Sequence, residues 1–591
     1  MKTPLFSTMP AFFHRKAMIG LSSLLLAALI CMLVIFSSAP LTQNDRFDQY
    51  TDQIFRSEVC GNTISLHYTL SNPSAYGIEE YPITLGSLDA ATYTASSATL
   101  ENYLNALQNF NREELSPENQ LTYDILTEYL KTEKEGADFY LYDEPLSPTL
   151  GIQAQLPVLL AEYTFRTRQD IEDYLALLTR IPDYFQSIIH YEKEKSKAGL
   201  FMNDSCVNAV LEQCSAFLQS GSENCLRQTF KEEIDAFTNL TADEKISFKK
   251  QNEEILEAYV LPAYQNLVQE LAKLLGSGTN KGGLCSFPKG KAYYTYLVHS
   301  ETGDASSIED IEARIKKEII SVYQDIQQLM NSSTGSAALE DTSSQPPAEI
   351  LSGLQQKIGA DFPAAPQVSC EVKYVPEALQ NYLSPAFYLI PPIDDYANNV
   401  IYINPASNYN ALELYTTLAH EGYPGHLYQT TTFEATDPSP LRSILNFGGY
   451  TEGWATYVEM YSYSTWNQNP GLAQLYQKDR SFMLGLASLL DIGIHYHGYS
   501  RSEVAGFLGR FGILEENSNA LYDNILEAPA NYLKYYVGYL NFLDLQTWMR
   551  QQLGDSFSLK EYHARVLNIG PCSFSVLKEY LMNGAYLRSI A

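Results

Sequence analysis

Apolar residues recur at three- and four-residue steps along much of the chain, which is the pattern of amphipathic helices. The clearest example lies in residues 168–197, where Ile171, Tyr174 and Leu178 recur among charged residues. The same pattern predicts helices at residues 207–220, 226–240, 243–275, 306–330, 349–358 and 410–422. A strand is predicted at residues 400–403, where the run VIYI is bounded by asparagines. The sequence therefore predicts a mainly α-helical protein with a small β element.

The first apolar segment differs from these helices because it carries no charge. Residues 17–36 are uncharged and follow the basic pair Arg15 and Lys16, and a helix of this length spans the roughly 30 Å hydrocarbon layer of a membrane. We therefore expect a cytoplasmic basic N-terminus at residues 1–16 and one transmembrane helix at residues 17–36. This single-pass anchor in the cell membrane would place everything after it outside the cytoplasm. Lipid attachment at Cys31 is the alternative, although the bulky Ile30 stands where a small residue is expected.

Length and loop composition predict how the rest of the chain is divided. A chain of 591 residues exceeds the roughly 250 to 300 residues at which single cores stop growing, so we expect two lobes around a cleft. Residues 331–347 are small, polar and proline-containing, and they predict a linker or exposed loop. The expected parts are then a tether and N-terminal helical segment at residues 37–150, a helical lobe at 151–330, and a second lobe at 348–591 that carries the candidate chemistry.

Net charge and composition exclude two classes of protein. The chain has 39 Lys and Arg against 69 Asp and Glu, a formal charge of −30, and it has no concentrated basic run. Nucleic-acid binding depends on basic side chains that release counterions from phosphates, so no nucleic-acid partner is expected. Hydrophobic residues at 45% exclude an intrinsically disordered chain.

The cysteines carry no recognisable metal or redox motif. Seven cysteines follow Cys31 and none forms a CxxC pair, so a thiolate zinc site is unsupported. A location outside the cytoplasm permits disulfides, for which residues 206–225 hold the densest cluster, whereas buried free thiols fit a chain of this size equally well. Both readings remain open at this stage.

Two histidines in the run HEGYPGH are the strongest chemical signal. In the zincin motif HExxH, histidines four residues apart lie about 40° apart around a helix and face one metal ion. His420 and His426 are six apart, which on a regular helix is about 600° and turns them away from each other. Pro424 and Gly425 stand between them and predict a break after Glu421 that lets His426 turn back toward His420.

Glu452 is the candidate third ligand. A catalytic zinc site needs three protein ligands and an open position, and the third is commonly a glutamate from a following helix. Residues 437–449 form a loop able to turn the chain back between His420 and Glu452. Glu459 lies seven positions after Glu452, on the same side of a helix, where it could orient a ligand. We expect one Zn²⁺ per chain on His420, His426 and Glu452.

These segments resemble the bacterial family called domain of unknown function 885 (DUF885). The resemblance rests on HEGYPGHLYQ at residues 420–429, EGWATYVE at 452–459, DIGIH at 491–495 and PANYLKYYVG at 529–538. It covers roughly residues 150–591. It implies a helical, gluzincin-like zinc metallopeptidase region that is similar to carboxypeptidase Taq.

The chain departs from the family pattern at a few positions. Ala530 and Asn531 replace a Gly-Gln pair, and Leu484 and Ala487 stand where the pattern has arginines. If those arginines bind a substrate carboxylate, carboxypeptidase-like specificity is in doubt in this chain. The metal residues match the pattern.

The expected chemistry is hydrolysis of a peptide bond by a water molecule on zinc. Bound zinc lowers the pKa of its water toward about 7, and Glu421 would take the proton and pass it to the leaving amine. His495 and Tyr535 are the candidate catalytic donors to the oxyanion, since both occur in family-like segments. An extended peptide substrate could pair with the edge of the predicted strand at 400–403.

The sequence thus predicts a membrane-anchored, extracytoplasmic zinc metallopeptidase acting on short peptides. Three polar residues that end an amphipathic helix at a Pro-Gly turn would produce the same HEGYPGH run without any metal. Two other classes also fit: a catalytically inactive peptide-binding protein on a zincin fold, and a zinc hydrolase of a non-peptide amide. Glu421 favours an enzyme, because a purely structural metal site needs no general base beside its ligand.

Overall fold

The chain is almost entirely helical around one small sheet. The computed structural model describes residues 41–278, 282–331, 345–375, 380, 384–407, 409–466 and 469–582. The helices of the first half are α2 (Gln43–Val59), α3 (Thr63–Thr69), α4 (Ala90–Leu107), α5 (Pro117–Gly136), α6 (Ile152–Ala161), α7 (Arg168–Leu178), α8 (Ile181–Ala198), α9 (Asp204–Gln219), α10 (Cys225–Ala236), α11 (Ala242–Ile255), α12 (Leu261–Ala272), α13 (Gly290–Thr302) and α14 (Ile308–Asn331).

The second half holds the three strands and the remaining helices. They are α15 (Pro347–Lys357), β1 (Ser369–Tyr374), β2 (Ala386–Leu389), β3 (Asn398–Ile403), α16 (Ala411–Glu421), α17 (His426–Glu434), α18 (Pro440–Ile444), α19 (Gly448–Ser462), α20 (Pro470–Ile492), α21 (Arg501–Gly509), α22 (Glu515–Glu527), α23 (Asn531–Leu553), α24 (Leu559–Ile569) and α25 (Phe574–Leu581). The predicted mainly helical class with a small β element is therefore confirmed, and β1 and β2 are additions to the one strand predicted.

The transmembrane part of the predicted fold class is corrected. Within the residues that the structure describes, no helix is both long and apolar enough to cross a membrane. Residues 1–16 and 17–36, on which the predicted cytoplasmic N-terminus and anchor fall, lie outside the described residues. The fold is accordingly a helical one with a three-stranded sheet, and the anchor is no longer part of it.

The strands form one sheet in the order β1-β3-β2, with β1 parallel and β2 antiparallel to β3. Val400 of β3 pairs with Glu371 on one side and with Leu389 on the other, so both edges of β3 are occupied. The predicted addition of a peptide to residues 400–403 is therefore wrong, because the β3 backbone is already paired on both sides. The edge strands are β1 and β2, and β2 packs against α16.

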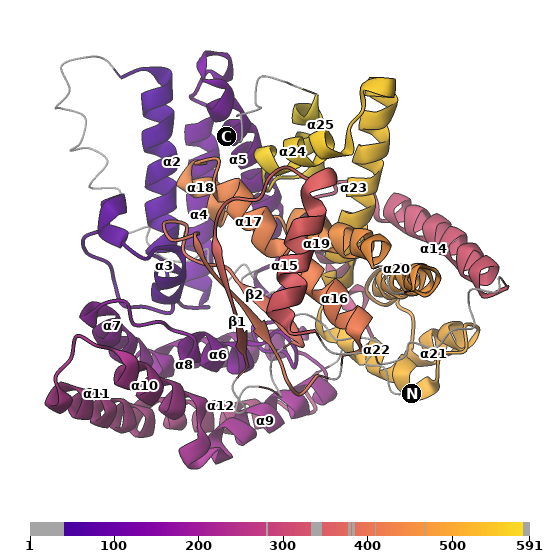
Figure 1. Ribbon diagram of the computed structural model, residues 1–591. Helices are drawn as coiled ribbons and strands as arrows, with labels where there is room; N and C mark the ends of the chain where they lie inside the picture. Colours follow the sequence, from indigo (N-terminus) through magenta and orange to yellow (C-terminus); the bar gives the residue numbers. More distant parts are fainter. Residues whose placement is uncertain are drawn as a thin grey trace.

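This sheet separates the two largest hydrophobic clusters. Phe387 and Tyr402 point into a cluster formed mainly by α6–α12, which lie together at the bottom of Figure 1. Tyr388 and Ile401, one position along each strand, point into a larger cluster that extends from α13 to α25. The alternation follows from the two-residue period of a strand. A third, smaller cluster joins α2–α5 with Leu441 of α18.

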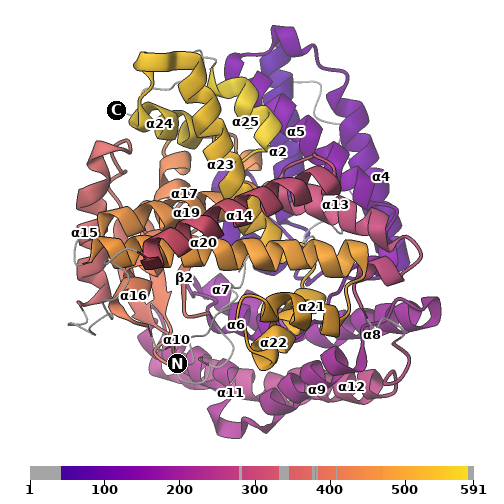
Figure 2. The same cartoon turned by 90° about the vertical axis from the view of Figure 1, so that its right-hand side faces the viewer.

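The largest cluster continues across the predicted boundary at 331–347. Ile315 of α14 and Leu351 of α15 belong to the same cluster, and α14 packs along α20 (Figure 2). Most of the boundary segment, residues 332–344, lies outside the described residues. The core that surrounds the candidate chemistry thus includes helices from both sides of the boundary.

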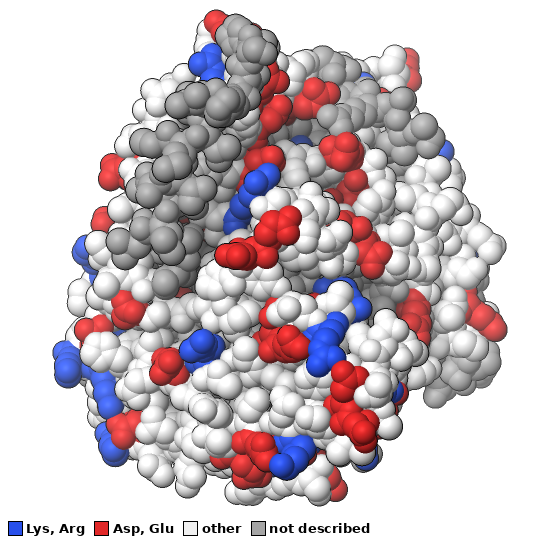
Figure 3. Space-filling view, turned by 90° about the vertical axis from the view of Figure 1, so that its left-hand side faces the viewer, with Lys and Arg blue, Asp and Glu red and all other residues white. Residues whose placement is uncertain are grey.

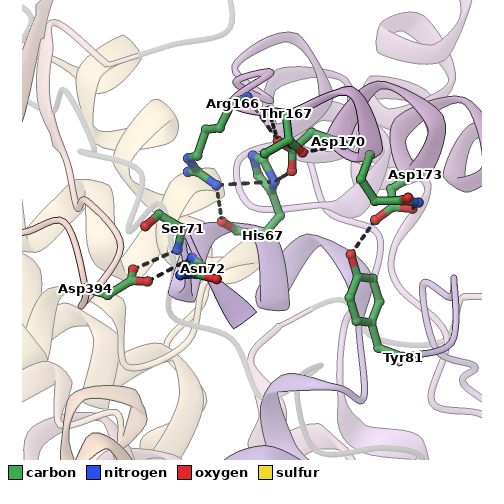
Figure 4. Close-up of polar contacts among 10 residues, drawn as sticks. His67, Ser71, Asn72, Tyr81, Arg166, Thr167, Asp170, Asp173 and Asp394 are labelled. Carbon is green, nitrogen blue, oxygen red and sulfur yellow. Dashed lines mark hydrogen bonds and ion pairs between the residues drawn. The ribbon is translucent and has the colours of Figure 1, made fainter. Parts of the chain in front are cut away.

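A polar junction ties the N-terminal helices to α7 and to the loop after β2 (Figure 4). Arg166 donates to the carbonyl oxygen of His67 at the end of α3, and Nδ1 of His67 lies 3.5 Å from Asp170 at the start of α7. The carboxylate of Asp394 accepts the backbone N–H groups of Ser71 and Asn72, at 2.7 Å and 2.8 Å. These contacts fix the loop after β2 between the N-terminal helices and the sheet.

The seven cysteines from Cys60 to Cys572 are free thiols in this structure, which agrees with the second of the two readings left open. On the face shown in Figure 3, the basic side chains of the described residues stand among acidic ones and do not gather into one patch.

Candidate metal centre

The two histidines approach each other because a helix ends between them. Helix α16 ends at Glu421, the peptide between Tyr423 and Pro424 is cis, and α17 begins at His426. The predicted break after Glu421 is therefore confirmed. The turn is tight at Gly425, where a Cβ atom would lie 1.7 Å from the carbonyl oxygen of His420. Only glycine fits there without a shift of the backbone.

Helix α19 holds this turn and supplies the third candidate ligand. The indole N–H of the fully buried Trp454 donates to the carbonyl oxygen of Pro424 at 2.9 Å. Glu452 lies two positions earlier on the same helix, with an exposed fraction of 5%. One helix thus fixes both the turn between the histidines and the carboxylate that faces them.

The side chains of His420, His426 and Glu452 converge. One ligand atom from each of the three lies within 4.8 Å of the other two. The Nε2 atoms of His426 and His420 are 3.4 Å and 3.8 Å from Oε2 of Glu452. Donors bound at about 2.1 Å to a tetrahedral zinc ion stand about 3.4 Å apart, so this spacing fits such an ion. The structure therefore brings together all three residues predicted as ligands.

Two of the converging atoms have no protein partner. Nε2 of His420 and Oε2 of Glu452 are buried and make no hydrogen bond with any described residue. Buried polar atoms in folded proteins almost always have a partner, and a cation between these atoms would satisfy both. Two imidazoles and one carboxylate are also the donor set that Zn²⁺ accepts in open catalytic sites. The residues present fit a zinc ion.

Glu459 contacts His420 on the side of the imidazole that faces away from the other candidate ligands. Its Oε2 lies 3.1 Å from Nδ1 of His420, and its Oε1 accepts a hydrogen bond from Nε of Arg480 on α20 at 2.8 Å. A carboxylate on Nδ1 fixes the imidazole so that Nε2 faces the ligand cluster. The structure thus places Glu459 against His420, as its predicted orienting role requires, and Arg480 holds Glu459 in turn.

Proton affinities at the cluster reflect the same contacts. Burial by itself would lower the pKa of His420, but the neighbouring carboxylates of Glu452 and Glu459 outweigh burial and raise the pKa to about 10. Burial would raise the pKa of Glu452, yet His420 and His426 hold it well below its ordinary value. Without a metal ion the cluster therefore retains a proton on His420 opposite an ionised Glu452. That buried positive charge is what a bound cation would replace.

Glu421 lies at the free edge of β2. Its Oε2 accepts the backbone N–H of Tyr388 at 2.9 Å, and its exposed fraction is 3%. Burial raises the pKa of Glu421, while the positive charge of His420 opposes that rise. A carboxyl group with a raised pKa next to these candidate ligands has the proton affinity expected of a general base.

Tyr535 of α23 is brought to the same place. Its ring is buried, and its hydroxyl pKa is raised well above the ordinary value by burial and by the negative charges of Glu452 and Glu421. A neutral hydroxyl beside these carboxylates is a hydrogen-bond donor at any physiological pH. The structure thus keeps Tyr535 within the candidate site.

Glycines allow α19 and α23 to cross closely enough for this arrangement. A Cβ atom on Gly453 would lie 2.5 Å from the backbone of Gly538, and one on Gly538 would lie 2.2 Å from the carbonyl oxygen of Gly449. Gly453 follows Glu452 directly, and Gly538 lies one turn after Tyr535. The close crossing therefore sets the distance between Glu452 and Tyr535.

His495 is not available to a substrate, contrary to the sequence prediction. Its Nδ1 accepts the backbone N–H of Leu284 at 3.1 Å, and its Nε2 donates to the carbonyl oxygen of Ile525 at 2.9 Å. Burial lowers its pKa to about 4, so the ring is neutral, as these two bonds require. With both nitrogens used by the backbone, His495 joins three segments of the core and has no donor left for an oxyanion.

Sequence reasoning missed three contributors to the site. They are the backbone N–H of Tyr388, the guanidinium of Arg480 and the ammonium of Lys534, which lies beside Tyr535 and whose charge helps to lower the pKa of Glu452. Lys534 could have been identified from the sequence, because it lies in a family-like segment directly before Tyr535. The other two depend on contacts across the fold.

The comparisons with known proteins agree on family and fold. The family model described as "Bacterial protein of unknown function (DUF885)" matches residues 74–581. The crystal structure of a "putative lipoprotein from Colwellia psychrerythraea" covers 92% of this chain and 100% of its own, with a TM-score of 0.83 and 18% identity. The solved structure of a "putative lipoprotein of unknown function from Shewanella oneidensis" covers 91% of this chain and 100% of its own, with a TM-score of 0.64 and 15% identity. Curated proteins gave no match. At these identities the two structures show a common fold.

Proposed function

The chain belongs to the DUF885 family of bacterial proteins of unknown function, and we propose that it is a zinc-dependent peptidase. One observation carries the proposal. Nε2 of His420 and Oε2 of Glu452 are buried without a partner beside His426, and the carboxylate of Glu421 stands at the adjacent strand edge. Ligands for one ion next to a buried general base are the minimum that metal-assisted hydrolysis requires.

His420, His426 and Glu452 would hold the ion. Bound Zn²⁺ supplies Lewis-acid polarisation of a carbonyl group and a water molecule with a pKa near about 7. Glu421 holds one carboxylate oxygen on the N–H of Tyr388, which leaves Oε1 to accept a proton from water and to return it to the leaving amine. Tyr535 is the donor for the developing negative charge, and Glu459 keeps His420 in its tautomer.

The location proposed is outside the cytoplasm and associated with the membrane. Support comes from the two solved structures of the same fold, which are described as lipoproteins. The substrates proposed are short peptides, because Glu421, Glu452 and Tyr535 are all largely buried and a folded protein would not reach them.

A peptide digest with two matched proteins tests the proposal. Purified protein, loaded with one equivalent of zinc, is incubated with a mixture of synthetic peptides and the products are read by mass spectrometry. Cleavage is expected for the wild type, with a fall of at least about a hundredfold after chelation and in Glu421→Gln. Glu371→Gln, on the exposed strand β1, serves as the control and keeps the wild-type rate.

Three results would contradict the proposal. Zinc bound at one equivalent without any Glu421-dependent cleavage would favour a non-catalytic peptide-binding protein. Glu421-dependent hydrolysis of acyl amides but of no peptide would favour an amide hydrolase. Failure to retain zinc would remove the metal chemistry altogether.

A further inference from the structure

A cavity of about 360 Å³ lies among the N-terminal helices, the loop after β2 and the start of α23. Its volume is in the range of about 300 to 1,000 Å³ typical of small-molecule sites. Much of its wall is hydrocarbon, contributed by α2–α6 and by the loop after β2. The apolar lining includes Ile54, Leu85, Leu100, Leu126, Leu130 and Ile393.

Two walls of the cavity belong to segments that also supply the candidate metal centre. One is the loop after β2: Ile390 lines the cavity and lies two residues after Tyr388, whose N–H holds Glu421. The other is the start of α23, where Lys534 lines the cavity and is followed by Tyr535. The cavity therefore reaches Lys534, whose charge also acts on Glu452, one of the candidate ligands.

Lys534 is a buried lysine whose charge helps to lower the pKa of Glu452 but which forms no ion pair within the described residues. Its exposed fraction is 2%, and it makes no hydrogen bond or ion pair with any residue that the structure describes. Its stem passes Gly448, and its ammonium lies 5.4 Å from the centroid of the Tyr535 ring. A buried charge is costly unless it is paired, so the position suits an anion that comes with a ligand.

The acidic residues of the cavity form no direct ion pair with this ammonium. Glu58, Glu133, Asp143 and Glu301 also line the cavity, and no ion pair within 4.0 Å joins any of them to Lys534 in the described part of the chain. Burial raises the pKa of Glu58 to about 7, which reduces its negative charge at neutral pH. An anionic group is thus favoured at the Lys534 end, and the apolar wall is left for a hydrocarbon side chain.

We propose that Lys534 binds the C-terminal carboxylate of a peptide whose last residue is apolar, with that residue's side chain in the cavity. The inference rests on the proposed peptidase and narrows it to removal of C-terminal residues. It also assigns the charge that binds the carboxylate to α23 and not to α20. Leu484 and Ala487 of α20 stand where the family pattern has arginines, but they are packed in the hydrophobic core and carry no charge.

Binding of two small probes to metal-free protein tests the proposal without catalysis. Calorimetry compares N-acetyl-L-leucine, which has a free carboxylate, with N-acetyl-L-leucinamide, which does not. The wild type is expected to bind the acid at least tenfold more tightly than the amide. Lys534→Met, which keeps the length of the side chain, is expected to lose this preference, and Lys534→Arg to retain most of it.

Matched controls distinguish the effect of the Lys534 charge from that of a lysine elsewhere on the protein. Lys478→Met removes a lysine that pairs with Asp325 on the surface and keeps the wild-type preference. The N-acetyl-glutamate α-amide, with its carboxylate on the side chain, is expected to bind more weakly than N-acetyl-L-leucine. Equal binding of acid and amide by the wild type would overturn the proposal even if Lys534→Met does not fold. Preference for the side-chain acid would overturn the assignment to a peptide C-terminus.

A second measurement distinguishes failure of this inference from failure of the peptidase. Zinc-loaded protein receives the same peptide with a free and with an amidated C-terminus. Glu421-dependent internal cuts in both peptides would leave a peptidase but refute the C-terminal site. Discrimination between the acid and the amide in binding, without any cleavage, would keep the site and refute the peptidase.

Discussion

The carboxylate of Glu459 lies 3.1 Å from Nδ1 of His420, on the opposite side of the imidazole from the atom that faces His426 and Glu452. This contact fixes the ring of one candidate ligand from outside the ligand set. Arg480 holds the other carboxylate oxygen, so the orientation depends on three helices at once.

Replacing Glu459 should weaken metal binding while leaving all three ligands in place. Glu459→Gln loses the negative charge behind His420, and the loss of such an orienting carboxylate typically reduces metal affinity by about 10- to 100-fold. Competition with a chelator of known affinity measures the change. Glu371→Gln on exposed β1 is the control. An unchanged affinity in Glu459→Gln would show that Glu459 does not orient the ligand.

Zinc should stabilise the fold through the same three residues. A ligand present at about 100 times its dissociation constant raises the free energy of unfolding by about 2.7 kcal/mol. We expect chelation to lower the thermal midpoint and added zinc to restore it. His426→Gln should lose most of this shift, whereas His299→Gln, at a partly exposed position of α13, should retain it. Equal shifts in both variants would place the zinc elsewhere.

Glycine positions at the site should tolerate no side chain. A Cβ atom on Gly425 meets the backbone of His420, so Gly425→Ala should destabilise the protein by about 1 to 3 kcal/mol or more and weaken zinc binding. Gly353→Ala is the control, because no atom lies within 4 Å of a Cβ there and alanine favours the α15 helix by about 0.5 to 1 kcal/mol. Urea unfolding measures both. A neutral Gly425→Ala would mean that the turn can open.

Acid should destabilise the protein partly through His495. Its folded pKa of about 4 lies below the ordinary 6.5, so between pH 6.5 and pH 4 the unfolded chain binds a proton that the folded chain does not. The free energy of unfolding therefore falls as pH falls through this window. His495→Asn keeps an acceptor for the Leu284 N–H and does not titrate, so its fall should be smaller by up to about 3 kcal/mol. Parallel pH profiles for wild type and variant would contradict this assignment.

Local backbone chemistry accounts for what the sequence predicts well. Proline and glycine act on their own neighbours, so the break between His420 and His426 follows from the residues at the break itself. The strands β1 and β2 were missed for different reasons. The run SCEVKY of β1 alternates polar and apolar residues, so its signal was present in the sequence, whereas β2 has only four residues, AFYL, which do not alternate.

Contacts between distant segments account for what the sequence could not predict. Arg480 reaches Glu459 only because α20 packs near α19, and no local pattern records that pairing. His495 lies in a segment that resembles a family motif, but spacing does not reveal that Leu284 and Ile525 occupy its two nitrogens. A motif identifies a residue type, whereas function depends on which atoms remain free.

The hydrogen bond by which β2 positions Glu421 does not depend on the identity of the residue that donates it. It comes from the main-chain N–H of residue 388, a group that every amino acid except proline supplies. Position 388 can therefore change its side chain through evolution and still orient the carboxylate. A list of invariant residues would therefore not include position 388. Substitution by proline would test the contact, because proline has no backbone N–H.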